Sequence, residues 1–232
     1  MPADATARLF EQIGKLEERE RFTEALRVAR RACALDPDEP AAWEARGELA
    51  LRSGELEESA ESFDRLTRLE PGSAEAWFAL GEALQWNARD GAEACFRQAA
   101  QLDPGRYVVP FRISPADFEA VAGAVLPTLP PQVIDFLEDT GTGIAVLPLP
   151  TLAMVVDSHL DPHALGYWLG NVYGVASAWG QANPAAIEIY QLNIENWCHD
   201  RATLSDEIRR TVLHEVGHAV GMDHPTLHAD GY

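Results

Sequence analysis

The chain has few cysteines, few positive charges and no long apolar run. Its three cysteines, Cys33, Cys95 and Cys198, are odd in number and far apart among 232 residues, which argues against a disulfide framework. The longest apolar candidate, GIAVLPLPTLAMVV, is interrupted by Pro148 and Pro150 and does not reach the roughly 18 residues that span a bilayer. The N-terminal MPADATARLFEQIG lacks the basic flank and apolar stretch of a secretion signal. We therefore expect a reduced, cytoplasmic protein.

Positive charge is scarce in both halves of the chain. There are 18 Lys and Arg residues against 37 Asp and Glu, a net charge of -19. Residues 1–104 carry 13 basic against 22 acidic side chains (-9), and residues 105–232 carry 5 against 15 (-10). An acidic surface repels phosphate backbones and anionic lipids. We therefore expect neither nucleic acid nor a membrane as a partner, although acidity also simply keeps a protein soluble.

The first hundred residues repeat themselves with a period of about 34. Trp43 and Trp77 are 34 residues apart in AAWEARGELALRSGELEESAESFDRLTRLEP and EAWFALGEALQWNARDGAEACFRQAAQLDP, as are Gly47 and Gly81. Each unit contains two helix-length segments with apolar residues at three- and four-residue spacing, separated by a break. The small residues let paired helices approach closely, and neighbouring units must stack to bury their apolar faces. A weaker first copy is marked by Phe10, Gly14, Ala25, Ala29, Ala32 and Pro37.

This pattern resembles the tetratricopeptide repeat family over residues 4–104, about three repeats. The resemblance implies a concave surface that is lined by the first helix of each pair and docks a peptide or protein partner. A scaffold that only supports its neighbour is the alternative. On the family's pattern the candidate groove residues are Glu44, Glu48, Phe78, Glu82 and Trp86, together with Arg8, Glu11, Lys15 and Glu75.

After Pro104 and Gly105 the pattern changes. Residues 115–140 are typical of one or two helices, whereas residues 143–150 and 185–194 are typical of strands. Residues 203–221 predict a long helix with Ser205 as its N-cap. The sequence therefore predicts two domains. Residues 1–106 form an all-α solenoid of helical-hairpin repeats, and residues 107–232 form a small α+β domain.

The histidine pattern near the C-terminus indicates a zinc site. All seven histidines follow residue 150, and His214 and His218 lie four apart, on one face of a helix. That spacing suits two imidazoles on one tetrahedral zinc ion at about 2.0–2.1 Å. Glu215 can reach a metal-bound water, and Gly221 can adopt positive φ so that His224 returns as the third ligand. Three protein ligands leave the fourth position to water, as in catalytic zinc sites.

This spacing resembles the metzincin motif HExxHxxGxxH, which implies three histidine ligands and a glutamate general base. Only eight residues follow His224, and none is the methionine of the metzincin turn. Residues 115–232 are more similar to the minimal zincin-like metallopeptidases of bacteria. In that family a strand of the form xITLYxxxIxxxC precedes the active-site helix, and here AIEIYQLNIENWC occupies that place. The family commonly has an acidic residue where His224 stands.

The resemblance also suggests a strand for substrate. Ile187, Ile189 and Tyr190 are candidates for an edge strand that pairs with an extended peptide, but the same residues suit an interior strand equally well. Weaker candidates are His159 and His163 with Asp157 and Asp161, as surface loop residues or a second metal site, and His228 with Tyr232, as cleft residues or a tail.

Together these patterns favour a zinc-dependent metallopeptidase with one zinc ion per chain. In this hypothesis Glu215 activates the zinc-bound water to hydrolyse a peptide bond, and the repeats dock a protein substrate or partner. The alternative is a non-catalytic interaction module in which zinc only holds the C-terminal domain together. Amide or ester hydrolysis of a small molecule is compatible with the same motif.

Overall fold

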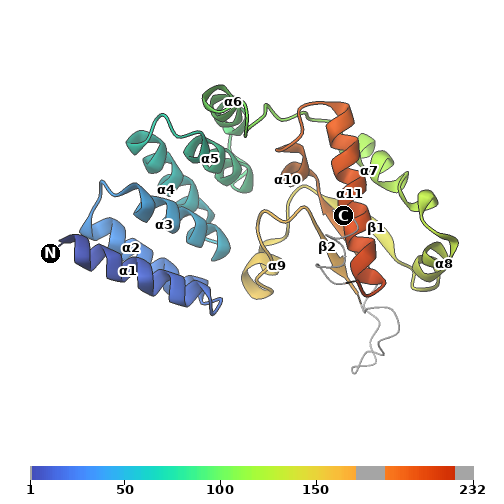
Figure 1. The fold of residues 1–232 in the computed structure, drawn as a ribbon, viewed down its shortest axis with the longest axis horizontal. Coiled ribbons are helices and arrows are strands. Elements are labelled where there is room, and N and C mark those ends of the chain that lie inside the picture. Colours follow the sequence, from blue (N-terminus) through green and yellow to red (C-terminus); the bar gives the residue numbers. More distant parts are fainter. Residues whose placement is uncertain (1, 171–185, 223–232) are drawn as a thin grey trace. The chain divides into compact units, whose positions relative to one another are not determined.

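The computed structural model describes residues 2–170 and 186–222 (Figure 1). Contacts divide the chain into two compact units. The first contains residues 1–109 together with 150–162, and the second contains residues 110–149 together with 163–232. The sequence pattern did not predict that residues 150–162 group with the first unit.

The first unit is built from three helical hairpins. Its helices α1 to α6 are, in order, Pro2–Glu17, Phe22–Leu35, Pro40–Arg52, Leu56–Leu69, Ala74–Trp86 and Ala92–Leu102. Each helix packs on the next one along the chain, so every hairpin buries its apolar face by stacking on a neighbour. The all-α repeat solenoid predicted from the sequence is confirmed.

Two glycines at equivalent repeat positions allow their helices to pack closely. A Cβ atom added to Gly47 would lie 2.7 Å from the ring of Phe63, and one added to Gly81 would lie 2.7 Å from the ring of Phe96. Both rings are buried. A methyl group at either glycine would overlap the ring, so the repeated glycine is required by this helix contact.

The repeated tryptophans each stabilise the turn before their helix. Trp43 Nε1 donates a hydrogen bond to the carbonyl oxygen of Pro37 at 2.9 Å, and Trp77 Nε1 donates one to the carbonyl oxygen of Pro71 at 3.0 Å. In both repeats donor and acceptor are six residues apart. The sequence period therefore reflects a repeated hydrogen bond as well as repeated packing.

The second unit joins a sheet to several helices. Its elements are α7 (Pro115–Gly123), the 3₁₀ helix η1 (Leu126–Thr128), α8 (Pro131–Asp139), β1 (Gly143–Leu147), β2 (Gly166–Leu169), β3 (Ala186–Tyr190), α10 (Gln191–Glu195) and α11 (Arg201–Ala219). The strand order is β1-β3-β2, with β1 parallel and β2 antiparallel to β3. This confirms the predicted small α+β domain.

The core of the second unit lies between the sheet and helices α7 and α11 (Figure 1). Ile187 and Ile189 of β3 pack in one buried cluster with Ile208 and Val212 of α11 and Phe118 of α7. Among the described residues, no single helix has the length and apolarity to cross a membrane. Helix α7 with η1 and α8 meet that test only as a pair bent by 118°.

The strand predicted over residues 185–194 ends earlier than expected. It stops at Tyr190, and Gln191 begins helix α10. The Gln191 side chain donates to the carbonyl oxygen of Ile113 at 3.0 Å, and the Leu192 amide donates to that of Pro148 at 3.0 Å. These long-range partners replace strand pairing after Tyr190, which the alternating sequence pattern did not reveal.

A buried carboxylate ties the start of the second unit to α10. Glu195 is 1% exposed. It accepts hydrogen bonds from Gln191 Nε2 at 2.8 Å and from the Ile113 amide at 3.2 Å, and Arg112 Nη1 lies 3.3 Å away. Since a buried charge is stable only with such partners, this cluster fixes α10 just before α11 begins.

The helix that carries the histidine motif begins at Arg201, before the predicted segment 203–221 and five residues before the start that a Ser205 cap implies. Asp200 is its N-cap, accepting a hydrogen bond from the Thr203 amide at 2.8 Å, and Thr203 Oγ1 in turn accepts one from the Asp200 amide at 3.2 Å. This is a capping box. The predicted cap, Ser205, instead lies inside the first turns of α11, because the Asp200 side chain already accepts the hydrogen bond from the Thr203 amide.

Candidate metal centre

The first two predicted zinc ligands lie together on α11. The Nε2 atoms of His214 and His218 are 3.1 Å apart, and their ring centroids are 4.7 Å apart at an interplanar angle of 85°. Both side chains are half-buried. As predicted from the four-residue spacing, the two imidazole rings lie on the same face of the helix with their Nε2 atoms next to each other.

The second ring nitrogen of His218 is held by the turn that ends the helix. His218 Nδ1 lies 3.1 Å from the carbonyl oxygen of Met222. A carbonyl oxygen only accepts hydrogen bonds, so Nδ1 carries the proton and Nε2 faces His214 Nε2 as the acceptor, the ring orientation of a metal-ligating histidine. Gly221 makes this turn possible with φ of +89°, a conformation that side chains other than glycine's rarely adopt.

The geometry of this histidine pair fits a zinc ion. Two ligands at about 2.0–2.1 Å from a tetrahedral metal are themselves about 3.3 Å apart, close to the observed Nε2–Nε2 distance of 3.1 Å. The predicted third ligand, His224, lies outside the described residues, as do His228 and Tyr232. Within residues 2–170 and 186–222, no group of three His, Cys, Asp or Glu side chains is placed to hold a metal. The same finding leaves no second metal site at Asp157 and Asp161.

Glu215, the predicted general base, is buried against β2. Its side chain is 7% exposed, and it accepts a hydrogen bond from the backbone N–H of Trp168. Burial raises the pKa of Glu215 to about 7, and the Trp168 N–H partly opposes that rise. The carboxyl group is therefore half protonated near neutral pH when no metal is present.

Gly166 in β2 allows this close approach between the strand and the helix. A Cβ atom added to Gly166 would lie 2.9 Å from Thr211 Cγ2 and 3.0 Å from Glu215 Cγ. Sequence reasoning missed both Gly166 and Trp168 as neighbours of the site. The only signal was a short apolar run, GYWL, which carries no ligand-type spacing.

Two further polar side chains of β3 lie near the site. Tyr190, fully buried, donates its hydroxyl to Glu188 at 2.8 Å. Burial first, then the Glu188 hydrogen bond and the charges of Glu188 and Glu215, raise the pKa of Tyr190 above its ordinary value. Tyr190 therefore stays protonated and acts as a hydrogen-bond donor rather than as a base.

The edge-strand interpretation of Ile187, Ile189 and Tyr190 is wrong. β3 is the central strand, paired with β1 on one side and β2 on the other, and all three side chains are fully buried. A strand with both backbone edges occupied cannot pair with a substrate peptide. The interior alternative, which the sequence left open, is correct.

The predicted groove residues divide into exposed and buried sets. Glu44 is exposed, and Glu48 and Trp86 are half-exposed. Phe78 and Glu82 are buried, at 5% and 8% exposure, which corrects their assignment to an open groove wall. Phe78 packs against the rings of Phe96 and Tyr107, at centroid distances of 5.2 Å and 4.9 Å. Tyr107 follows the last repeat helix and covers Phe78. Tyr107 is not part of the repeat pattern.

The remaining groove carboxylates influence one another. Desolvation raises the pKa of Glu44 above its ordinary value, and the negative charges of Glu75 and Glu48 raise it further. Desolvation raises the pKa of Glu17, which is outside the predicted groove set, while Arg52 lowers it and Glu48 raises it. The surroundings of Glu44 are therefore negative, although Glu75 is paired with Arg106 at 3.1 Å.

The fold and site together define a helical repeat array joined to a domain with a zincin-type histidine helix. Comparison with known families agrees. Residues 15–73 and 49–107 match the tetratricopeptide repeat model, and residues 141–232 match the zincin-like metallopeptidase model. The chain thus has tetratricopeptide repeats in its N-terminal part and a zincin-like domain in its C-terminal part. A search of curated proteins gave no significant match.

Solved structures that resemble the chain include tetratricopeptide repeat proteins. The Sgt2 repeat domain from Aspergillus fumigatus is 22% identical, with a TM-score of 0.41, over 44% of this chain and 68% of that one. YrrB, described as a repeat protein with an unusual peptide-binding site, is 23% identical with a TM-score of 0.41, over 43% of this chain and 52% of that one. The first repeat domain of Spaghetti (RPAP3), solved with an HSP90 peptide, is 17% identical with a TM-score of 0.41, over 43% of this chain and 80% of that one.

Proposed function

We propose that this protein is a zinc-dependent peptidase in which His214, His218 and His224 bind the metal and Glu215 is the general base. The observation that carries the proposal is the convergence of His214 Nε2 and His218 Nε2 at 3.1 Å. The Met222 carbonyl oxygen at His218 Nδ1 supports it further, because a ring oriented in this way presents its other nitrogen as a ligand. The match of residues 141–232 to zincin-like metallopeptidases supports the same reaction class.

In this proposal the chain supplies the proton transfers. A zinc ion, when bound, supplies Lewis acidity that polarises the scissile carbonyl and makes a water more acidic. Glu215 accepts one proton from the attacking water as the new C–O bond forms. It then delivers that proton to the amide nitrogen as the C–N bond breaks. Trp168 orients the carboxyl group through its backbone N–H, and the burial of Glu215 shields the proton transfers from bulk water.

We further infer that the repeat unit docks a basic peptide or protein segment. Glu44 lies among Glu75, Glu48 and Glu70, whose negative charges, after desolvation, raise its pKa, and Glu75 itself is paired with Arg106 at 3.1 Å. Opposite charge on a partner would relieve this repulsion and steer its approach. Docking would also raise the effective concentration of a substrate that is tethered to the same chain.

A non-catalytic role for the zincin-like domain is the second candidate. The burial of Glu215 and its hydrogen bond to the Trp168 backbone favour it, because a structural carboxylate has the same surroundings. In that case the repeats would act alone as an interaction module, and the metal would only stabilise the second unit.

Metal analysis and peptide cleavage separate the two functions. We expect the purified full chain to contain about one zinc per chain and to cleave casein or a mixed peptide library. Glu215→Gln should keep the metal and lose cleavage, by roughly 100-fold or more, whereas His214→Ala should lose both. Equal cleavage by wild type and Glu215→Gln would exclude Glu215 as the base. Bound zinc with no cleavage of any substrate would favour the structural role.

A further inference from the structure

A groove of about 580 Å³ lies between the first half of α1 and the last turns of α2, and is here called the α1–α2 groove. It is lined by Arg8, Leu9 and Gln12 on α1 and by Arg31 and Leu35 on α2, and two alanines complete the lining. Leu35 is 44% exposed, which is a large exposed fraction for a leucine in a helix. The α1–α2 groove therefore combines accessible apolar surface with two guanidinium groups.

The repeat period shows what the same helix position does in the other repeats. Leu9 stands one residue before the repeated aromatic side chain, as Ala42 and Ala76 do in the second and third repeats. Ala42 is fully buried in a cluster with Ala32 and Cys33 of the preceding helix, α2. Ala76 is buried in the same way against α4. Leu9 is only half-buried, and among the described residues no helix precedes α1. A helix is therefore the shape that this position accepts.

Helix α2 is basic in an otherwise acidic chain. It carries three arginines against one glutamate, whereas the whole chain has a net charge of -19. Arg30 is paired with Glu58 of α4 at 2.5 Å, but within residues 2–170 and 186–222 no ion pair contains Arg31. An exposed guanidinium group that no carboxylate of the chain neutralises, next to apolar surface, suits an acidic group on a partner.

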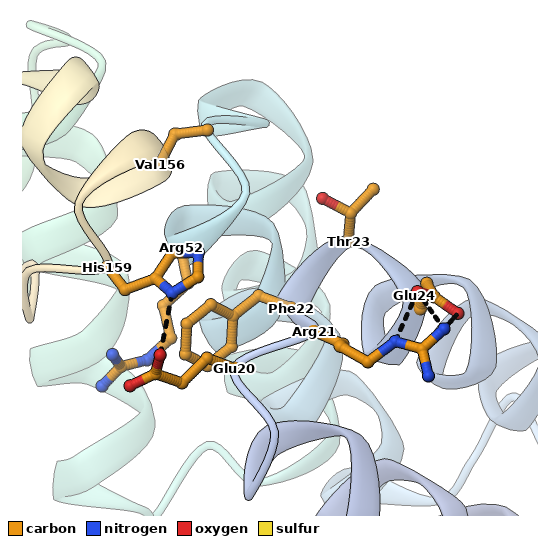
Figure 2. A pocket seen from close by; sticks show the side chains of 8 residues that line it. All are labelled: Glu20, Arg21, Phe22, Thr23, Glu24, Arg52, Val156 and His159. Atoms are coloured by element: carbon orange, nitrogen blue, oxygen red, sulfur yellow. Dashed lines mark hydrogen bonds and ion pairs between the residues drawn. The ribbon is translucent and has the colours of Figure 1, made fainter.

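A second pocket on the same hairpin differs because its charged side chains are already paired (Figure 2). It has a volume of about 200 Å³ and lies where α1 turns into α2. Arg21 Nη2 donates to Glu24 Oε2 at 2.6 Å, and Glu20 Oε2 lies 3.1 Å from Nδ1 of His159, which follows α9 (Leu152–Asp157). These groups neutralise one another within the first unit, so of the two pockets the α1–α2 groove is the better site for a charged partner.

We propose that the α1–α2 groove binds an amphipathic helix of another protein, one that carries acidic side chains beside its apolar face. The apolar face packs on Leu9 and Leu35, and a carboxylate pairs with Arg31. Charge disfavours the same groove of a second copy, because two α1–α2 grooves face to face would bring their arginines together. The site uses other residues than the acidic surroundings of Glu44, and it requires neither zinc nor peptide hydrolysis.

Fluorescence anisotropy with a labelled helical peptide tests the proposal on the full chain. The probe is a peptide of about 15 residues, long enough to form a helix, with Leu and Ala on one face and Glu on both flanks of that face. In its neutral counterpart Gln replaces every Glu. We expect the acidic peptide to bind roughly 10-fold more tightly than the neutral one, and this difference to shrink as salt screens the charges. Because the chain as a whole repels anions, such a preference requires a local basic site.

A pair of double variants locates the binding site. Arg31→Glu with Leu35→Gln, the groove variant, removes a positive charge and an exposed apolar side chain and should weaken binding of the acidic peptide roughly 10-fold or more. The matched control, Arg97→Glu with Leu102→Gln, makes the same changes on α6, where Arg97 is exposed and Leu102 is 38% exposed. The control should bind the peptide as the wild type does. All four side chains are exposed, so both variants should keep the wild-type circular dichroism spectrum.

Several outcomes would overturn the proposal. The wild type could bind the acidic and neutral peptides equally well, the groove variant could keep the wild-type affinity, or the control variant could weaken binding as much as the groove variant does. Sedimentation of the free chain tests the other occupant. A concentration-dependent dimer that the groove variant abolishes would assign the α1–α2 groove to a second copy of this chain and overturn the proposed partner, whereas a monomer in both proteins supports it.

Discussion

Glu215 shows how one residue's surroundings alter its chemistry. Burial against β2 raises its pKa from an ordinary 4.5 to about 7. Between these values the folded protein binds more protons at this site than the unfolded chain does. The resulting stabilisation is complete below pH 4.5 and is lost as pH rises to about 7, a change on the order of 3 kcal/mol.

We therefore expect metal-free protein to lose thermal stability between pH 4.5 and 7, and Glu215→Gln to lose much less. Melting curves across this range, in a chelator, measure the difference between the two proteins. Glu188→Gln is the control. Its side chain is only half-buried, so this variant should lose stability between pH 4.5 and 7 as the wild type does. A slope that is the same in wild type and Glu215→Gln would show that this carboxyl titrates normally.

Helix contacts determine what substitutions the repeats tolerate. Gly47→Ala would push a methyl group into the Phe63 ring at 2.7 Å, and overpacking of this kind costs about 1–3 kcal/mol. Gly14, in α1, has no atom within 4 Å of an added Cβ, so Gly14→Ala should stabilise by up to about 1 kcal/mol through helix propensity. Chemical denaturation of both variants measures the two free energies. If both substitutions changed the free energy of unfolding in the same direction, the close contact at Gly47 would be refuted.

The start of α11 provides a second prediction about an element. Asp200→Ala removes the side chain that accepts from the Thr203 amide at 2.8 Å and should cost about 0.5–2 kcal/mol. Ser205→Ala should cost much less, because Ser205 lies beyond the cap. Denaturation of the two variants compares the observed cap with the one expected from sequence. A larger loss from Ser205→Ala would reverse the assignment.

At the scale of the whole molecule, the two units should respond differently to metal removal. If zinc binds His214 and His218, its loss removes binding energy from the second unit alone, about 2.7 kcal/mol at a metal concentration 100 times Kd. Calorimetry should therefore show two transitions, of which a chelator lowers one by on the order of 10 °C. In His214→Ala the chelator should change neither. A chelator that shifts both transitions, or none, would contradict a zinc site confined to this unit.

The sequence by itself determined the features that depend on spacing along one helix or one repeat. His214 and His218 share a helix face whatever surrounds them, Gly221 supplies its positive φ locally, and the glycine and tryptophan period defines the hairpins. These inferences succeed because each needs only the geometry of a helix or of a stacked pair.

The tertiary structure alone decided which distant segments meet. β3 became the centre of the sheet because both β1 and β2 pair with it, and Phe78 became buried because Tyr107 packs over it. Glu215 owes its raised pKa to burial, which the Trp168 N–H partly opposes, and Trp168 lies some fifty residues away in sequence. No local pattern encodes such contacts, since their energy exists only after the chain has brought the segments together.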